Sequence, residues 1–373
     1  MSVPTTGVTI RAAALACALG NDLDSAADRL LAGSPVAPRR VTAGEDWPYF
    51  AVDIAGNDWM ERAERIARAV ARDLKTRAGL AESQWSELPC IVGSSSYSVG
   101  AGDGNGWPSL EMPLDFCDRL ARWFGVRGPA MAVTTACTSG LGAIALASQL
   151  IAAGAFREAL VLGVELSNRL TVAGFAGLEL LSRTGARPCD RDRDGMVLGE
   201  AFGAILLSAE PAAGSDAWHL RALASGMDAA SLTGPSPDGA AIARTMREAM
   251  MKARWNAETV DLVKLQASGS HMSDAAEAHA LRALFSSPRA VSLKGSLGHT
   301  LGASGPAELA LLARCLERGR VPRTWGFSTP DETLGLTPSN ETANADADNV
   351  RRVLFNLSGF GGNVMTLALE RNA

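Results

Sequence analysis

Cys137 is the residue of this sequence best placed to act as a nucleophile. It lies in the run Val133–Ala143 (VTTACTSGLGA), where β-branched residues lead in, small residues surround the cysteine and an apolar stretch follows. This pattern predicts a strand, a sharp turn and a buried helix, with Cys137 at the helix start. The positive end of a helix dipole favours the thiolate, which is the reactive form. The alternative is an inert cysteine in the core, the usual state of a free thiol.

Three further motifs carry residues that could work with such a thiol. One is Arg187–Glu200, with the sequence RPCDRDRDGMVLGE. Another is Lys294–Gly305 (KGSLGHTLGASG), which places Lys294 and His299 among small residues. The last is the glycine-rich segment Ser358–Asn363 (SGFGGN), a predicted turn.

Together these motifs resemble those of the β-ketoacyl synthases, the condensing enzymes of the thiolase superfamily. The Cys137 run is similar to the family's nucleophile motif. The other three are similar to its second signature, its lysine–histidine motif and its C-terminal glycine turn. The stretches Leu30–Ser34 and Leu232–Gly239 also fit the family. The motifs occur in the family's order and cover nearly the whole chain, so the resemblance predicts the family's fold.

The resemblance implies a role for each matched residue. Cys137 would attack an acyl thioester and form an acyl-enzyme. The backbone N–H groups of Cys137 and Phe360 would donate to the oxyanion. His299 would be one of two histidines that hydrogen-bond the enolate formed when a malonyl thioester loses CO₂. Lys294 would be the lysine of the same motif and Glu277 its acidic partner. An ordinary structural ion pair of Lys294 and Glu277 is the alternative, and it is compatible with a catalytic role.

The sequence departs from the family at the first of these two histidines. The family places that histidine in a His-Gly-Thr motif ahead of the helix that carries Asp274 and Glu277. Matching Ser268–Ser270 to the motif puts Ser268 where the imidazole should be. Serine donates a hydrogen bond but does not titrate near neutral pH. His271, three residues on, either swings in to compensate or is a histidine of a surface loop.

Three functions are open on this sequence. The chain is a condensing enzyme of fatty acid or polyketide-type biosynthesis with an unusual site, or a transacylase or priming enzyme that loads Cys137 without elongation. Otherwise it is a non-elongating partner subunit similar to the chain-length factors. The partner reading ranks last, because chain-length factors typically lack the nucleophile. By resemblance, acyl and malonyl groups arrive on the phosphopantetheine arm of an acidic acyl carrier protein, and no other cofactor is implied.

A basic surface would suit that acidic carrier. Arg62, Arg65, Arg68 and Arg72 recur at three- and four-residue steps in a predicted helix, so they share one face. They form either a docking patch or a solvated face balanced by nearby acidic residues. The resemblance also implies a dimer, either a homodimer or a heterodimer with another ketosynthase-like subunit.

Strands and helices that alternate along the chain must bring these motifs together. Helices are predicted at Trp59–Ala78, Pro113–Phe124, Gly239–Ala253, Asp274–Phe285 and Pro306–Arg318. Strands are predicted at Val8–Leu15, Pro89–Gly93, Ala159–Glu165, Ala201–Ser208, His219–Ser225, Val260–Ala267, Ala290–Leu293, Val353–Leu357 and Met365–Glu370. Asp274 is the expected helix cap, with Glu277 at capping-box spacing. The alternation predicts an α/β fold with a largely parallel sheet covered on both faces.

The resemblance makes this fold prediction more specific. It implies a thiolase-like fold of two similar α/β halves in a five-layer αβαβα arrangement. The halves are expected at residues 1–209, which carry the nucleophile, and 210–373, which carry the lysine–histidine motif. The segment Glu210–Ser215 is the predicted seam.

Composition argues against several other classes of protein. The net charge of −5 gives no indication of nucleic-acid binding. The six cysteines form no CxxC pair, so neither a zinc site nor a disulfide framework is predicted. Reduced thiols in a cytoplasmic protein are expected. The apolar runs Ala12–Leu19 and Ala143–Ala153 are too short to span a bilayer, and the N-terminus lacks the pattern of a signal peptide.

Overall fold

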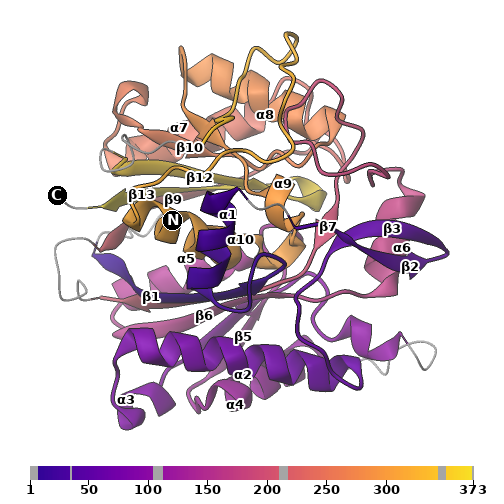
Figure 1. Cartoon of the computed structure of the whole chain (residues 1–373). Coiled ribbons are helices and arrows are strands. Elements are labelled where there is room, and N and C mark those ends of the chain that lie inside the picture. The colour runs from indigo at the N-terminus through magenta and orange to yellow at the C-terminus, as the bar shows by residue number, and fades with distance from the viewer. Residues whose placement is uncertain (1–6, 34–35, 104–111, 210–216, 343–349, 372–373) are drawn as a thin grey trace.

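Ten strands of the chain form one hydrogen-bonded sheet in the computed structural model, which describes residues 7–33, 36–103, 112–209, 217–342 and 350–371 (Figure 1). One half of the sheet contains β1 (Val8–Cys17), β4 (Cys90–Gly93), β5 (Ala130–Val133), β6 (Glu158–Glu165) and β8 (Ala201–Ser208). The other half contains β9 (Trp218–Met227), β10 (Leu262–Lys264), β11 (Ala290–Val291), β12 (Arg352–Ser358) and β13 (Asn363–Arg371). The predicted seam lies outside the described residues.

The two halves repeat the same strand order and directions. From the centre outwards the order is β1, β8, β6, β4, β5 in one half and β9, β13, β12, β10, β11 in the other. In each half the two inner pairings are antiparallel and the two outer ones parallel. An antiparallel pairing of β1 with β9 joins the halves. Two similar halves are therefore confirmed.

The prediction of a largely parallel sheet is wrong. Short return connections, such as the turn that joins β12 to β13, can link only antiparallel neighbours, whereas parallel pairs need a long crossover. The crossover helices therefore serve the outer strands of each half, and the strands near the centre run against each other.

Helices cover both faces of each half and complete five layers (Figure 1). The outer face of the first half carries α2 (Trp59–Ala78), α3 (Glu82–Ser86) and α4 (Pro113–Phe124). The outer face of the second half carries α7 (Ala240–Ala253) and α8 (His271–Leu284). Between the halves lie α1 (Leu23–Ala32), α5 (Ser139–Ala152) and α10 (Ser304–Glu317). Three large clusters of buried apolar residues separate these layers, so the αβαβα arrangement is confirmed.

The helices differ in polarity according to their layer. α2 buries one apolar face, begins at the cap Asp58 and ends at Gly79, which adopts a left-handed conformation. α5 has no charged residue, because both sides of it face apolar layers. No helix in the described part of the chain combines the length and apolarity that crossing a membrane would require.

A satellite layer that the sequence did not predict packs around Cys137. It consists of the hairpin β2 (Arg39–Ala43) and β3 (Glu45–Phe50), the short strand β7 (Leu198–Gly199) and the helix α6 (Arg169–Gly177). Its apolar side chains, including Trp47 and Val172, form one buried cluster with Cys137. The hairpin was missed because β2 alternates little and β3 contains acidic residues and a proline.

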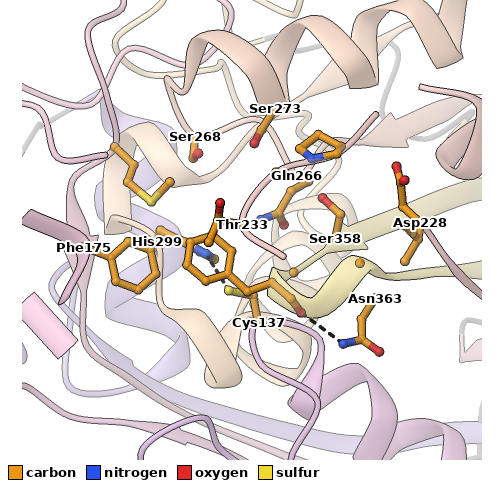
Figure 2. Close-up of a pocket in the computed structure, with 17 residues that line it drawn as sticks. Cys137, Phe175, Asp228, Thr233, Gln266, Ser268, Ser273, His299, Ser358 and Asn363 are labelled. Carbon is orange, nitrogen blue, oxygen red and sulfur yellow. Dashed lines mark hydrogen bonds between the residues drawn. The ribbon is translucent and has the colours of Figure 1, made fainter. Parts of the chain in front are cut away.

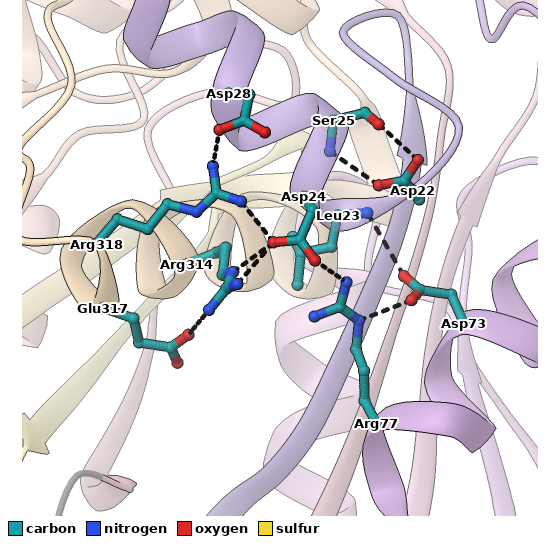
Figure 3. A network of polar contacts seen from close by, with 10 residues as sticks. All are labelled: Asp22, Leu23, Asp24, Ser25, Asp28, Asp73, Arg77, Arg314, Glu317 and Arg318. Carbon is teal, nitrogen blue, oxygen red and sulfur yellow. Dashed lines mark hydrogen bonds and ion pairs between the residues drawn. The ribbon is translucent and has the colours of Figure 1, made fainter.

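An ion-pair network ties the two halves together behind the central layer. Asp24 of α1 accepts hydrogen bonds from Arg77 of α2 and from Arg314 and Arg318 of α10 (Figure 3). Burial acts in the opposite direction, but these hydrogen bonds hold the pKa of the Asp24 carboxyl well below its usual range. Because α10 belongs to the second half, the network links segments about 290 residues apart.

Glycine backbone sets the spacing between the central helices and the sheet. A Cβ atom on Gly203 of β8 would lie 2.5 Å from the backbone N of Ala307 in α10. One on Gly140 of α5 would lie 2.4 Å from Cδ of Pro306. Contacts this short between carbon and backbone atoms are repulsive, so α10 can approach β8 and α5 only where no side chain stands.

We expect Gly203→Ala to lower the free energy of unfolding by roughly 1–3 kcal/mol, because the new methyl group has no space against α10. Gly174→Ala on α6 is the matched control, since a Cβ there meets nothing within 4 Å. In that helix alanine should be neutral or slightly stabilising. Urea denaturation followed by circular dichroism measures both. Equal stability of the two variants would contradict the packing argument.

Candidate active site

Cys137 lies in a tight turn between β5 and α5. Hydrogen bonds from Thr138 N to Thr135 O (3.2 Å) and from Ser139 N to Ala136 O (3.1 Å) close the turn. Ala136 has a φ of 52°, a left-handed conformation that is strained for a residue with a side chain. Cys137 is held just ahead of α5 and is 5% exposed. The predicted strand, turn and buried helix are confirmed.

His299 faces Cys137 across a pocket. Its Nε2 lies 3.2 Å from Sγ of Cys137, and its side chain is buried. The backbone of His299 is fixed on β7: its N–H donates to the Val197 carbonyl (2.8 Å), and its carbonyl accepts from Gly199 N (3.0 Å). The second signature motif therefore positions the histidine of another motif.

The glycine turn after β12 lies directly against the nucleophile. A Cβ atom on Gly359 would be 3.0 Å from N and 3.2 Å from Cβ of Cys137, so a side chain there would crowd Cys137. The backbone N–H groups of Phe360 and of Cys137 itself both act to lower the pKa of the Cys137 thiol, against the larger effect of burial. The structure thus brings the two N–H groups expected to serve an oxyanion to the reacting atom.

The Cys137–His299 pair is neutral at rest. Burial raises the pKa of the Cys137 thiol to about 12, although the Lys294 ammonium acts in the opposite direction. Burial, followed by the charges of Lys294 and Lys264, holds the pKa of His299 well below its usual range. The thiolate expected from the helix dipole is therefore not the resting form. Neutral His299 can instead accept the thiol proton as the sulfur attacks.

The expected pairing of Glu277 with Lys294 is wrong. The Glu277 carboxylate accepts hydrogen bonds from the backbone N–H groups of Gln266 and Ala267, both at 2.8 Å. Lys294 is the first residue of α9 (Lys294–Leu297), and its ammonium forms a buried ion pair with Glu308 of α10. Glu277 does not reach Lys294 because α8 places it against the residues that follow β10. The carboxylate that reaches the Lys294 ammonium is instead brought there by α10.

Asp274 also has a role other than the predicted helix cap. α8 begins three residues earlier, at His271, and Ser270 is its N-cap. The Asp274 carboxylate accepts hydrogen bonds from the backbone N–H groups of Cys189 (2.8 Å) and Ser268 (2.9 Å). It therefore ties the loop before α8 to the second signature motif.

The side chain that faces the Cys137–His299 pair from the β10–α8 segment is an amide. Gln266 and Ser268 both line the pocket that contains the pair. In Figure 2 the Gln266 side chain points toward the pair, whereas Ser268 lies farther toward α8. Gln266 is 7% exposed, and its Oε1 has no hydrogen-bond partner among the described residues. Motif matching therefore chose Ser268 and missed Gln266, the first polar side chain after the buried strand.

An aromatic pair covers the apolar side of the pocket. Phe175 of α6 stacks on Phe360, with ring centroids 5.1 Å apart and an interplanar angle of 13°. Both phenylalanines line the pocket that contains Cys137, and Phe175 is labelled in Figure 2. The pocket therefore offers an apolar wall next to the sulfur and hydrogen-bonding groups opposite, an arrangement that suits a chain with a polar reacting end.

Other sequence candidates lie away from the pocket. His271 is exposed at the start of α8, in agreement with the alternative that it is a surface histidine. Arg62 is committed to an ion pair with the buried Glu200 (2.6 Å), so it cannot belong to a docking patch. Arg65 and Arg68 pair with glutamates one turn earlier on α2. Among the described residues, no group of three or more His, Cys, Asp or Glu side chains could hold a metal ion.

Comparison of sequences gives two family matches. The model of the β-ketoacyl synthase N-terminal domain matches residues 43–213, and that of the C-terminal domain matches residues 219–328. The ketoacyl synthase alpha subunit of the tetracenomycin polyketide synthase of Streptomyces glaucescens is 33% identical over 70% of this chain and 64% of that protein. The 3-oxoacyl-[acyl-carrier-protein] synthase 2 of Vibrio cholerae is 31% identical over 66% of this chain and 63% of that protein. Both alignments span just under two thirds of the relative.

Solved structures share the fold over almost the whole chain. A ketosynthase (ApeO) in complex with its chain length factor (ApeC) from Xenorhabdus doucetiae has a TM-score of 0.84 at 24% identity, over 98% of each chain. A β-ketoacyl synthase from Burkholderia phymatum has a TM-score of 0.83 at 24% identity, over 100% of each chain. These likenesses describe the thiolase-like fold.

The raised pKa of Cys137 predicts slow alkylation that depends strongly on pH. We expect the rate of its modification by iodoacetamide to rise through pH 10 without levelling near about 8.5, the ordinary thiol pKa, because burial disfavours the thiolate. Peptide mass spectrometry over a pH series measures this rate. Cys137→Ser gives the background from the other five cysteines, all buried. A plateau between pH 8 and 9 would contradict the prediction.

Proposed function

Because the chain belongs to the β-ketoacyl synthase family, we propose that it is an acyltransferase. Cys137 accepts an acyl group from an acyl carrier protein and condenses it with a malonyl thioester, in fatty acid or polyketide-type biosynthesis. The observation that carries the proposal is the 3.2 Å contact of Cys137 Sγ with His299 Nε2 in a buried pocket. A thiol in contact with a neutral imidazole is the arrangement that nucleophilic catalysis requires.

The first step is acyl transfer to the sulfur. As Cys137 Sγ attacks the thioester carbonyl, its proton passes to His299 Nε2. The backbone N–H groups of Cys137 and Phe360 receive the negative oxygen of the tetrahedral intermediate. The bond from the carbonyl carbon to the phosphopantetheine sulfur then breaks, and the leaving thiolate takes the proton from His299. The phosphopantetheine arm comes with the carrier, so the protein needs no separate cofactor.

The second step makes the carbon–carbon bond. A malonyl thioester loses CO₂, and the electron pair of the broken C–C bond becomes an enolate that attacks the acyl carbonyl on Cys137. The bond from that carbonyl carbon to Sγ then breaks, and Cys137 leaves as a thiolate that takes up one proton to restore the thiol. The enolate oxygen needs hydrogen-bond donors. His299 and the Gln266 amide line the same pocket. The amide can donate through its NH₂ group, and His299 can donate from Nε2 in the tautomer that carries the proton there. His299 is the only imidazole among the described residues that line this pocket. Gln266 cannot take its place in proton transfer, because an amide does not change its protonation state near neutral pH.

That amide favours a second candidate, a transacylase or priming enzyme. Acyl transfer uses Cys137, His299 and the backbone donors alone, whereas decarboxylation in the family uses two histidines. A site with Gln266 in place of one imidazole is therefore better suited to the first step than to the second. A non-elongating partner subunit ranks below both, because the nucleophile and its base are present and in contact.

The test is intact-protein mass spectrometry after mixing the protein with acyl-carrier thioesters, with and without malonyl carrier. We expect an acyl adduct on the wild type, none on Cys137→Ala, and adduct formation slowed on the order of 100-fold or more in His299→Ala, which lacks the base. Analysis of carrier-bound products in the same samples detects elongation. A ketoacyl product supports the condensing enzyme, and an adduct without product supports the transacylase.

Gln266→His separates these two outcomes further. It supplies the second imidazole, so elongation should rise if the amide limits the second step, while acylation stays within a few fold. Ser268→Ala is the matched control, because it removes the residue that motif matching had favoured. Elongation lost in Ser268→Ala but unchanged in Gln266→His would contradict the role given to Gln266. Absence of any adduct from every carrier tested would overturn the proposed function.

We propose further that the protein works as a dimer, with a second copy or with another ketosynthase-like subunit. β5 is an end strand of the ten-stranded sheet, and its outer edge pairs with no strand in the described part of the chain. Its four residues, Ala130–Val133, are apolar and incompletely buried. An apolar strand edge of this kind invites pairing. The Xenorhabdus doucetiae structure pairs a ketosynthase with a chain length factor, which supports the heterodimer as one form.

We expect Ala132→Lys, at the exposed position of β5, to shift the protein toward monomer, because like charges would face each other across a paired edge. Size-exclusion chromatography with light scattering gives the mass. Met251→Lys, at an exposed position on α7 of the other half, is the control and should leave the mass unchanged. An unchanged dimer in Ala132→Lys would exclude β5 from the interface.

A further inference from the structure

Two lysines share one glutamate in the core beneath the pocket. Lys264 of β10 and Lys294 of α9 each form an ion pair with Glu308 of α10, on opposite oxygens of its carboxylate. All three side chains are 0% exposed. The Lys264 Nζ also lies 4.4 Å from the centre of the Phe355 ring, which can favour a cation. The proposed acyl transfer assigns no role to Lys264.

Two other buried carboxylates, Glu277 and Glu165, accept hydrogen bonds from other groups. Glu277 accepts the N–H groups of Gln266 and Ala267, and its Oε1 also accepts from Asn356 Nδ2 at 2.6 Å. Glu165, at the end of β6, accepts from the backbone of Ser95 and Gly302. Neither makes an ion pair with the second lysine. With both lysines protonated, the group holds two cations against one directly paired anion.

The presence of lysine rather than arginine beside Glu308 suits a side chain that can release its proton. The chain has only four lysines among its 35 basic residues, and two of the four stand in this group. A buried lysine can become neutral, whereas arginine stays charged. Desolvation lowers the pKa of Lys264 to about 7, with Glu308 acting in the opposite direction and Lys294 adding to the fall. Lys264 can thus change its charge at a pH close to neutrality.

His299 is the neighbour on which this change acts. Cys137 contacts its Nε2 at 3.2 Å, and the charges that act on it are those of Lys294 and Lys264. Its Nδ1 has no hydrogen-bond partner among the described residues, so no carboxylate stabilises an imidazolium there. Lys294 and Lys264 both disfavour its cationic form.

We propose that Lys264 is a positioning residue that takes up a proton in place of His299, so that the imidazole stays neutral opposite Cys137. As the pH falls below neutrality, Lys264 becomes charged first, and the two cations then oppose protonation of His299. The consequence for catalysis rests on the proposed acyl transfer, since neutral Nε2 is the acceptor for the thiol proton. The protonation order itself does not depend on any substrate.

The first measurement is nuclear magnetic resonance of the wild type with labelled lysine Cε and histidine Cε1 atoms. With four lysines and four histidines, Lys264→Gln and His299→Ala assign the two signals needed. We expect Lys264 to titrate near pH 7, about three pH units below the ordinary lysine value. His299 should stay neutral to well below the ordinary histidine pKa of about 6.5. A Lys264 signal that stays constant from pH 6 to 9 would overturn the proposal.

The second measurement is the same histidine titration in Lys264→Met. Loss of the charge should raise the midpoint for His299 by roughly half a pH unit or more. It should also move the pH below which the rate of Cys137 acylation falls to a higher value. Lys252→Met, which removes a lysine paired with Glu248 on the surface of α7, should change neither. If the methionine variant does not fold, Lys264→Gln replaces it, since an amide can still donate to Glu308.

If the titration midpoint of His299 is unchanged in a folded Lys264 variant, Lys264 has only a structural role and the proposal is wrong. This result is distinguishable from failure of the proposed function. If no carrier acylates Cys137 but the His299 midpoint moves, the protonation order holds and the proposed acyl transfer fails. If acylation occurs and the midpoint is fixed, the acyl transfer holds and the role of Lys264 fails.

Discussion

The close contact of α5 with α10 is the constraint on which the site depends. Each helix begins directly after a loop that carries one reacting side chain, Cys137 before α5 and His299 before α10. The helices meet through glycine backbone: a Cβ atom on Gly305 would lie 2.5 Å from Leu141 N. With the starts of both helices pinned in this way, the two loops have little freedom. The 3.2 Å separation of Sγ and Nε2 follows from packing in the core.

Burial also determines the protonation state of Cys137. A helix N-terminus stabilises a nearby anion by about 0.3–1 kcal/mol. Raising the pKa of a thiol to about 12 costs the thiolate on the order of 4 kcal/mol. Desolvation therefore wins at Cys137, and the nucleophile must form as it reacts. Burial of the pair also strengthens the hydrogen bonds that the backbone N–H groups of Phe360 and Cys137 can offer to an oxyanion.

The sequence predicted what short motifs encode and missed what tertiary packing decides. Cys137, His299 and the glycine turn at Phe360 were found because local residue types define them, and the five layers followed from the family resemblance. The partner of Lys294 was not found, because Glu308 reaches it only through the packing of α10. A single acidic residue among the apolar first turns of that helix was the available signal. Gln266 was missed because matching by residue type favoured a serine two positions later.

The repeat of strand order explains why the contact of Cys137 with His299 needs both halves of the chain. β5 and β11 occupy equivalent places in the two halves, and so do the loops that follow them. One loop supplies sulfur and the other supplies imidazole, and they meet where the halves face each other. A polypeptide of half this length with the same topology would carry one loop only. It would have to associate with a second copy to bring two such loops together, and both would then be identical. Because both halves stand in one chain, their equivalent loops can differ, and one carries a thiol where the other carries an imidazole.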